Sequence, residues 1–284
     1  MLSKIRKWLH SPAGVRVQVL SDLHLEVADQ YATYTFPVAA PFLLLAGDIG
    51  RLIDYDSYLK FLVAQVSRFD KVFLILGNHE FYGLGYQSGL DQAQRFTEEP
   101  TLQEKLVLLH KSRWDDPDSN LTILGCTLWS SVPDEALDIV KIKISDFKKI
   151  QNWTVHDHNR VHLDELRWLR DQVSQAKQGS DRTILVATHH APCVEGASRP
   201  EHAQNPWTSA FTTELLSDDS FEGVKFWVFG HTHYTTRFAK RGIEVVANQR
   251  EYVLPGSSTH LEGQSATKAK KEKNTFDPSC TIRI

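Results

Sequence analysis

Three stretches near the start of the chain decide the expected fold: VRVQVLSDLH (residues 15–24), FLLLAGD (residues 42–48) and KVFLILGNHE (residues 71–80). Each begins with an apolar or alternating run typical of a buried strand and ends in carboxylate, amide or imidazole side chains. Between the second and third stretches, residues 55–69 carry apolar side chains at helical spacing. Apolar strands that alternate with a helix predict an α/β fold whose sheet is covered on both faces.

The same arrangement recurs later in the chain. An expected strand at 183–188 ends at His189-His190, and another at 225–229 ends at Gly230-His231-Thr232-His233. We also expect helices at 87–99 and 161–178, strands at 105–109 and 121–127 around a turn-rich 115–120, a hairpin of 235–239 with 243–247, and an edge strand in 276–284. Neither an internal repeat nor a linker divides residues 1–284, so we expect one domain, with a mobile loop at 256–274.

The residue types after these strands predict a metal site. Asp22 and His24 are one residue apart, as are His231 and His233, so in an extended segment both members of a pair would point the same way. Asp48 follows a glycine at a strand end, where its carboxylate could bridge two cations. The set predicts a dinuclear metal centre with seven ligands: Asp22, His24, Asp48, Asn78, His189, His231 and His233. The amide oxygen of Asn78 suits octahedral Mn, Fe or Mg better than a tetrahedral structural zinc.

The blocks SDLH, AGD, GNHE, THHAP and GHTH, in this order between residues 15 and 250, resemble those of the calcineurin-like metallophosphoesterase superfamily. The resemblance implies a four-layer α/β/β/α sandwich of two mixed sheets flanked by helices, with the site at the strand ends. It also implies the division of the ligands: Asp22, His24 and His233 on one metal, Asn78, His189 and His231 on the other, and Asp48 bridging.

The resemblance further implies a hydrolase of phosphoric esters. A hydroxide held between the two metals would attack phosphorus in line, and the metals would offset charge on the phosphoryl oxygens. The catalytic residues would be His79, Asp48 and Asn78, with His79 contacting phosphate and protonating the leaving oxygen instead of binding metal. Glu80 would orient the site from behind the ligands. The two divalent ions would be Mn, Fe, Zn or Mg, with Mn the first choice.

Two positions leave a choice open. Thr-His before Ala-Pro favours His189 as the ligand, as in the family's Thr-His-Gly-Pro-Pro variants, whereas a His-x-Pro spacing favours His190. The segment 152–162 (NWTVHDHNRVH) is either a polar loop that enters a helix or a loop over the metals that contacts substrate through His158, Asn159 or His162. Glu26 reads as a surface residue.

The residues after Asp48 separate branches of the superfamily. Protein phosphatases carry GDxxDRG, whereas here Asp48 is followed by IGRLID, and purple acid phosphatases have a tyrosine where this chain has Arg51. We therefore expect a phosphodiesterase or phosphatase of small molecules. The alternatives are a Ser/Thr protein phosphatase-like enzyme or a non-enzymatic scaffold that kept the fold.

Composition restricts the partners. With 32 Lys and Arg against 35 Asp and Glu, the net charge is −3, which argues against general nucleic-acid binding. Three widely spaced cysteines argue against a disulfide framework, and no apolar run reaches membrane-spanning length. We expect a cytoplasmic enzyme with a small-molecule phosphate ester as its substrate; the oligomeric state does not follow from the sequence.

Overall fold

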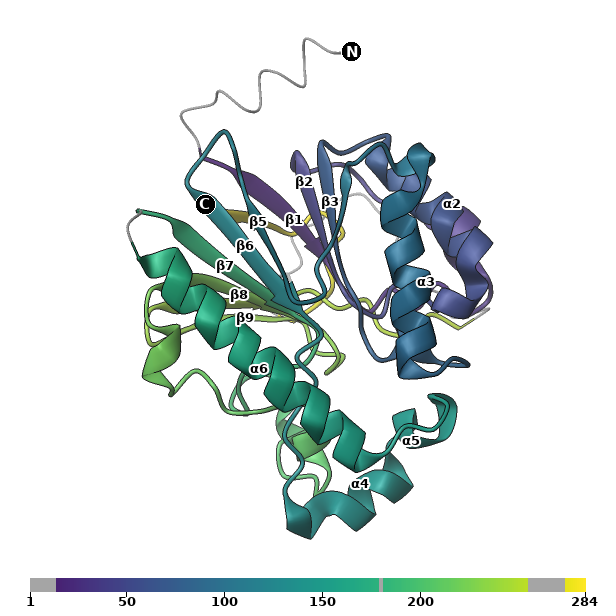
Figure 1. Cartoon of the computed structure of the whole chain (residues 1–284), viewed down its shortest axis with the longest axis vertical. Coiled ribbons are helices and arrows are strands. Elements are labelled where there is room, and N and C mark those ends of the chain that lie inside the picture. Colours follow the sequence, from purple (N-terminus) through teal and green to yellow (C-terminus); the bar gives the residue numbers. More distant parts are fainter. Residues whose placement is uncertain (1–13, 179–180, 255–273) are drawn as a thin grey trace, which may run out of the picture.

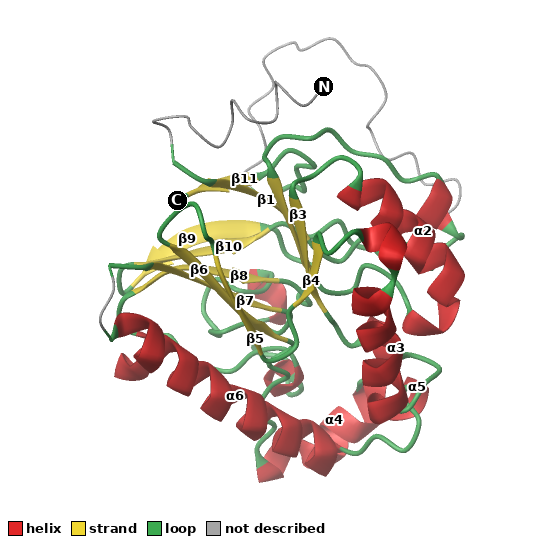
Figure 2. Ribbon diagram, turned by 45° about the horizontal axis from the view of Figure 1, so that its top comes forward, coloured by secondary structure: helices red, strands yellow, loops and turns green. Residues whose placement is uncertain are grey.

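Two β-sheets lie face to face between helices in the computed structural model, which describes residues 14–178, 181–254 and 274–284 (Figures 1 and 2). The first sheet has the order β11 (Thr281–Arg283), β1 (Arg16–Leu20), β2 (Phe42–Ala46), β3 (Lys71–Ile75) and β4 (Leu106–Leu108). Strands β1 to β4 are parallel, and β11 pairs antiparallel with β1 at the edge, as expected for the C-terminal segment. Apart from Asn274, the loop expected at 256–274 lies outside the described residues.

The second sheet is also mixed. Its order is β5 (Ser112–Asp115), β6 (Leu121–Cys126), β7 (Thr183–Thr188), β8 (Val224–Phe229), β10 (Ile243–Ala247) and β9 (Thr236–Lys240). Its four central strands are parallel, and the edge strands β5 and β9 are antiparallel to their neighbours. The sequence did not predict β5, of which only Asp115 lies in the turn expected at 115–120, because its residues are partly exposed and polar.

Alternation along the strands sends successive side chains to opposite faces, which builds three layers of core. One layer fills the space between the sheets and includes Val19, Phe73, Ile123 and Val228. The opposite face of the first sheet packs on α2 (Tyr55–Val66) and α3 (Tyr86–Glu98), and that of the second on α6 (Val155–Lys177). The order is therefore helix, sheet, sheet, helix.

Helix α6 begins six residues before its expected start. Thr154 caps it, with its hydroxyl accepting from the Asp157 backbone while the Asp157 carboxylate accepts from the Thr154 backbone. His158, Asn159 and His162 therefore lie in the first turns of a helix, neither in an entry loop nor in a loop over the site. They hold the segment after β6: His158 Nε2 lies 2.9 Å from Ser130 Oγ, Asn159 bonds both backbone groups of Val132, and His162 Nδ1 lies 2.8 Å from the Leu128 carbonyl.

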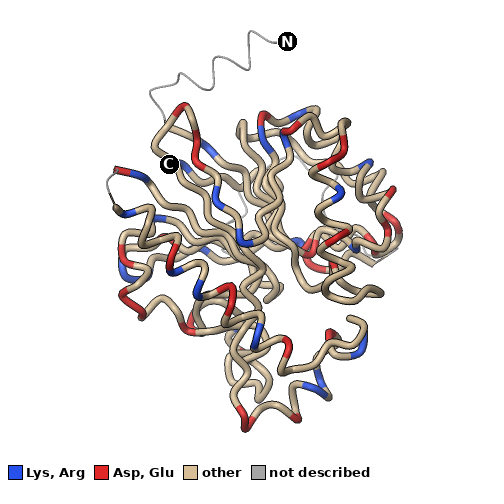
Figure 3. The backbone as a smooth tube through the Cα atoms, in the orientation of Figure 1, with Lys and Arg blue, Asp and Glu red and all other residues tan. Residues whose placement is uncertain are grey.

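Two short helices that the sequence did not predict, α4 (Leu137–Lys143) and α5 (Asp146–Lys149), precede α6 at the lower end of the molecule in Figure 1. Each is too short for apolar periodicity to show in the sequence. Acidic and basic side chains are interspersed over the outer helices and loops (Figure 3). Every helix within the described residues is too short or too polar to cross a membrane.

Candidate metal centre

The predicted ligands come from loops at the carboxyl ends of parallel strands in both sheets. Asp22 and His24 follow β1, Asp48 follows β2, Asn78 follows β3, His189 follows β7, and His231 and His233 follow β8. The strand registers place these ends level: Leu20 pairs with Leu45 in the first sheet, and Ala187 with Val228 in the second. The site therefore lies where the ends of the two sheets meet.

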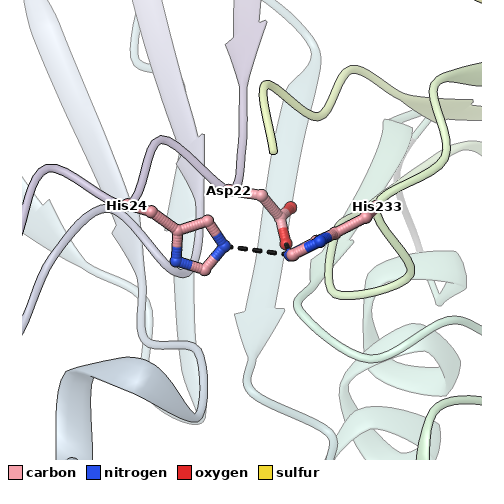
Figure 4. A group of neighbouring side chains, drawn as sticks. All are labelled: Asp22, His24 and His233. Atoms are coloured by element: carbon pink, nitrogen blue, oxygen red, sulfur yellow. Dashed lines mark hydrogen bonds and ion pairs between the residues drawn. The ribbon is translucent and has the colours of Figure 1, made fainter. Parts of the chain in front are cut away.

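One group of candidate ligands consists of Asp22, His24 and His233, whose ligand atoms all lie within 4.8 Å of one another. His24 Nε2 lies 2.9 Å from His233 Nε2, and His233 Nε2 lies 3.6 Å from Asp22 Oδ1. Figure 4 shows the two rings turned toward each other with the Asp22 carboxylate beside them.

A second group consists of Asp48, His189 and His231. His189 Nε2 lies 3.3 Å from Asp48 Oδ1 and 3.1 Å from Asn78 Oδ1, so the amide oxygen faces the same group. His189 Nδ1 faces the Ala46 carbonyl at 2.9 Å and donates its hydrogen there, so Nε2 is the ring atom turned toward Asp48 and Asn78.

Asp48 stands between the two groups. Its Oδ1 is the atom near His189, while its Oδ2 lies 3.9 Å from His24 Nε2. One carboxylate therefore turns a different oxygen toward each group, as a bridging ligand requires.

His190 lies apart from these groups. It is fully buried, and neither ring nitrogen has a hydrogen-bond partner in the part of the chain that the structure describes. Its ring packs against His231 (centroids 4.1 Å apart) and Trp129 (5.3 Å apart). The structure thus places His189 among the candidate ligands and His190 behind them; the role of His189 as a ligand stays a prediction.

The backbone around the ligands differs from the expected extended form. Asp22, His24, Asp48, His231 and His233 have φ between 46° and 70°, in the left-handed region that residues with a Cβ rarely adopt. Strain of this kind persists only where surrounding contacts enforce it. The expectation of extended segments is wrong because β1 and β8 end before their ligands, at Leu20 and Phe229.

Two glycines allow the ligand loops to approach closely. A Cβ on Gly77 would lie 2.2 Å from Asp48 Oδ1, and one on Gly230 would lie 2.7 Å from Asp22 Oδ2. Both distances are far below contact, so any side chain there would displace a candidate ligand.

The donor atoms fit divalent metal ions. His231 Nε2 is buried without a hydrogen-bond partner among the described residues, and the Nε2 atoms of His24 and His233 lie 2.9 Å apart and face each other. Burial lowers the pKa of His233 to about 3 and that of His231 well below its ordinary value, so both rings are neutral and present lone pairs. Buried imidazole, carboxylate and amide groups of this kind are ligands for Mn, Fe, Zn or Mg.

His79 lies beside the two groups with its ring held at both nitrogens. Nδ1 lies 2.9 Å from Glu26 Oε1, and Nε2 lies 3.0 Å from the hydroxyl of Tyr252 and 4.0 Å from Asp48 Oδ2. Burial lowers the pKa of His79, but the Asp48 and Glu26 carboxylates outweigh it and the net shift is upward. The two carboxylates therefore favour the protonated ring.

The prediction that Glu26 is a surface residue is wrong. Its Oε1 lies between two histidine nitrogens, 2.9 Å from His79 Nδ1 and 3.3 Å from His24 Nδ1, and its side chain is 9% exposed. The continued one-residue spacing of Asp22, His24 and Glu26 was a signal that could have found it.

Glu80 is fully buried and binds the backbone that carries other site residues. Its Oε2 accepts from the amides of Gly77 (2.7 Å) and Asp48 (2.9 Å). Its Oε1 accepts from the amides of Ile49 (2.9 Å) and Gly50 (3.3 Å) and from the Tyr58 hydroxyl (3.0 Å). One carboxylate thus joins the loops after β2 and β3.

A cavity of about 450 Å³ opens in front of the candidate ligands. Its inner end is formed by Asp48, Asn78, His79, His231 and His233. Its outer walls come from the α4–α5 segment and from residues 198–212, and its aromatic side chains are Tyr82, Trp207, Phe211 and Tyr252. Sequence reasoning missed these wall residues because they lie outside the motif blocks.

Comparisons with known proteins agree with this geometry. A model of the calcineurin-like phosphoesterase family matches residues 15–235. An uncharacterized protein of Acanthamoeba polyphaga mimivirus is 27% identical over 293 residues, covering 94% of this chain and 96% of the viral protein.

Two solved structures show a similar fold. The phosphopantetheinyl hydrolase of Mycobacterium tuberculosis is 16% identical with a TM-score of 0.61, over 86% of this chain and 92% of that one. A dimetal phosphatase of Danio rerio is 14% identical with a TM-score of 0.50, over 84% and 88%. The predicted arrangement of two mixed sheets flanked by helices is confirmed.

Proposed function

The chain belongs to the calcineurin-like phosphoesterase family, and from this premise we propose that it hydrolyses phosphoric esters of small molecules with the aid of two divalent metal ions. The observation that carries the proposal is the convergence of buried oxygen and nitrogen donors from both sheets around Asp48. When bound, such ions lower the pKa of a coordinated water and offset negative charge on the phosphoryl oxygens.

The residues divide into two sets of ligands about Asp48. Asp22, His24 and His233 would hold one ion, and Asn78, His189 and His231 would hold the other. The two oxygens of Asp48 face the two sets separately, which supports a bridging role. Because the donors are all nitrogen or oxygen, Mn, Fe, Zn and Mg each fit, and Mn is the first ion to test.

His79 is suited to protonate the leaving oxygen. Glu26 accepts the hydrogen on Nδ1 and fixes the plane of the ring, so the proton available for transfer would be one on Nε2, which faces the cavity. An imidazolium in this position can pass its Nε2 proton to an alkoxide as the ester bond breaks. Tyr252, whose hydroxyl meets Nε2, marks the place where the leaving oxygen would sit.

The cavity supports a small-molecule substrate. Its volume of about 450 Å³ falls in the range of sites for such ligands. Trp207 and Phe211 offer apolar surface to the leaving group, and Lys143, whose Nζ lies 5.5 Å from the Trp207 ring centre, is the one lysine or arginine among the lining residues. A small phosphomonoester or a phosphodiester fits this space better than a folded phosphoprotein.

Metal analysis and a substrate panel test the proposal. We expect about two Mn ions per chain, and we expect Asp48→Ala to lose both ions together with hydrolysis of aryl mono- or diesters. Full activity in that variant, or after chelation, would contradict the proposal.

A second variant tests the proton transfer. His79→Ala should keep its ions but lose turnover, least for aryl esters because their leaving groups need no proton. An equal loss for all leaving groups would reject the role of His79 as an acid.

A further inference from the structure

Asp146, the first residue of α5, is a buried carboxylate that belongs to none of the motif blocks. It is 1% exposed and contributes to the cavity wall beside Asn78. Its Oδ1 accepts from Asn78 Nδ2 at 2.8 Å and from the Tyr82 hydroxyl at 2.7 Å. The contact with Asn78 spans 68 positions of sequence and joins the α4–α5 segment to the candidate metal centre.

The hydrogen bonds have a fixed direction. Because the Tyr82 hydrogen goes to Asp146, the Tyr82 oxygen is free to accept from Asn78 Nδ2, and it lies 3.1 Å away. The two oxygens are 2.7 Å apart, so both accept on the same side of the amide nitrogen. The amide oxygen must point the other way, where it lies 3.1 Å from His189 Nε2.

The alternative orientation of the amide is unfavourable. If the Asn78 amide turned over, its oxygen would meet Asp146 Oδ1 and would face an oxygen that has no hydrogen to give. The Asp146 carboxylate therefore accepts from the amide nitrogen and disfavours the amide oxygen at this place.

We propose that Asp146 is a positioning residue that holds the Asn78 amide with its oxygen, and not its nitrogen, toward the ion shared with His189 and His231. This rests on the proposed function, since it requires an ion at that place. An amide nitrogen cannot bind a divalent ion, so a free amide would lose affinity whenever it turned. Groups that orient metal ligands in this way typically contribute about 10- to 100-fold in affinity.

Titration of the metal-free protein with Mn²⁺ alone tests the proposal, with calorimetry for stoichiometry and electron paramagnetic resonance for coupling between ions. Asp146→Leu should bind one ion as the wild type does and the second about 10- to 100-fold more weakly. Its spectrum should change from that of a coupled pair to that of isolated Mn²⁺. Asp146→Asn, which keeps an acceptor oxygen, should bind both ions with nearly wild-type affinity.

Two further variants serve as controls. Tyr82→Phe keeps the bond between Asp146 and Asn78 and should still bind two ions. The double exchange Asn78→Asp with Asp146→Asn reverses donor and acceptor, and it should also bind two ions because either oxygen of a carboxylate can face the metal. Where circular dichroism shows that leucine at position 146 prevents folding, Asp146→Ala, which also removes the acceptor and keeps Asn78, tests the same expectation of a weakened second ion.

The outcomes separate the two proposals. A wild-type chain that binds no Mn²⁺ overturns both. Two ions at wild-type affinity in Asp146→Leu overturns the positioning role alone. An equal loss of Mn²⁺ affinity in Asp146→Asn and Asp146→Leu also overturns the positioning role, because the charge of Asp146 and not the orientation of Asn78 would then explain the loss.

Discussion

Replacing Glu80 by glutamine is expected to be among the most destabilising single-atom changes in this chain. The five groups around the carboxylate are all donors: four backbone amides and the Tyr58 hydroxyl. Burial and the neighbouring Asp48 carboxylate raise the pKa of Glu80 to about 7, so at pH 8.5 the carboxylate is the dominant form. A glutamine has one acceptor atom and must turn its NH₂ toward donors on the other side.

The magnitude follows from the two bonds that Glu80→Gln cannot make. The oxygen of glutamine best replaces Oε1, which has three donors, and its NH₂ then faces the amides of Gly77 and Asp48. A hydrogen bond to a charged group is worth about 1.5–3 kcal/mol, so two lost bonds cost about 3–6 kcal/mol. For a chain of this length that corresponds to a fall in Tm of roughly 6 °C or more.

Thermal and denaturant unfolding of the metal-free protein at pH 8.5 measure this effect. Glu99→Gln is the matched control, because Glu99 Oε1 accepts from the Tyr55 hydroxyl and an amide oxygen can do the same. We expect the free energy of unfolding of the control to change by less than about 0.5 kcal/mol. A Glu80→Gln variant within about 1 kcal/mol of the wild type would refute the reasoning, since the loops would then not depend on the carboxylate.

Three further predictions concern other buried or cavity residues. Burial raises the pKa of Glu165 to about 8, so the stability that its protonated form contributes is complete below the pKa of the unfolded chain and is lost as pH rises through 8. Glu165→Gln should remove this pH dependence, and parallel Tm curves for variant and wild type between pH 5 and 9 would contradict the prediction. Glu26→Leu frees His79 Nδ1 and should lower kcat about 10-fold or more with little change in KM, as steady-state kinetics would show. Trp207→Ala should raise KM about 2- to 10-fold for esters with bulky leaving groups and not for methyl esters; equal changes in both would exclude contact with the leaving group.

The sequence predicted the parts of the fold that depend on apolar runs. The strand at 183–188 was found with its predicted bounds, and each block of polar residues follows its strand. The blocks lie close together because the carboxyl ends of parallel strands share an edge of the sheet. The start of α6 was missed because its first turns carry histidine and asparagine, which bind the segment after β6 instead of packing as an apolar face.

The surroundings of the ligands were less predictable. Asp146 comes from a helix of four residues and reaches Asn78 only through tertiary packing, so no local pattern announces it. Glu26 was misjudged because the left-handed backbone at His24 brings the following residues back under the histidines. The motif blocks thus indicate which side chains gather, while the groups that orient them depend on contacts between distant segments.

The origin of the donors from both sheets has a consequence for the lifetime of the protein. The first sheet carries Asp22, His24, Asp48 and Asn78, and the second carries His189, His231 and His233. Separation of the two sheets at the site would therefore release any bound ion. An ion present at 100 times its dissociation constant adds about 2.7 kcal/mol against such opening. Local opening is the step at which proteases attack. Metal supply would therefore control how quickly the chain is degraded as well as how fast it reacts, and cells depleted of metal should contain less of the protein.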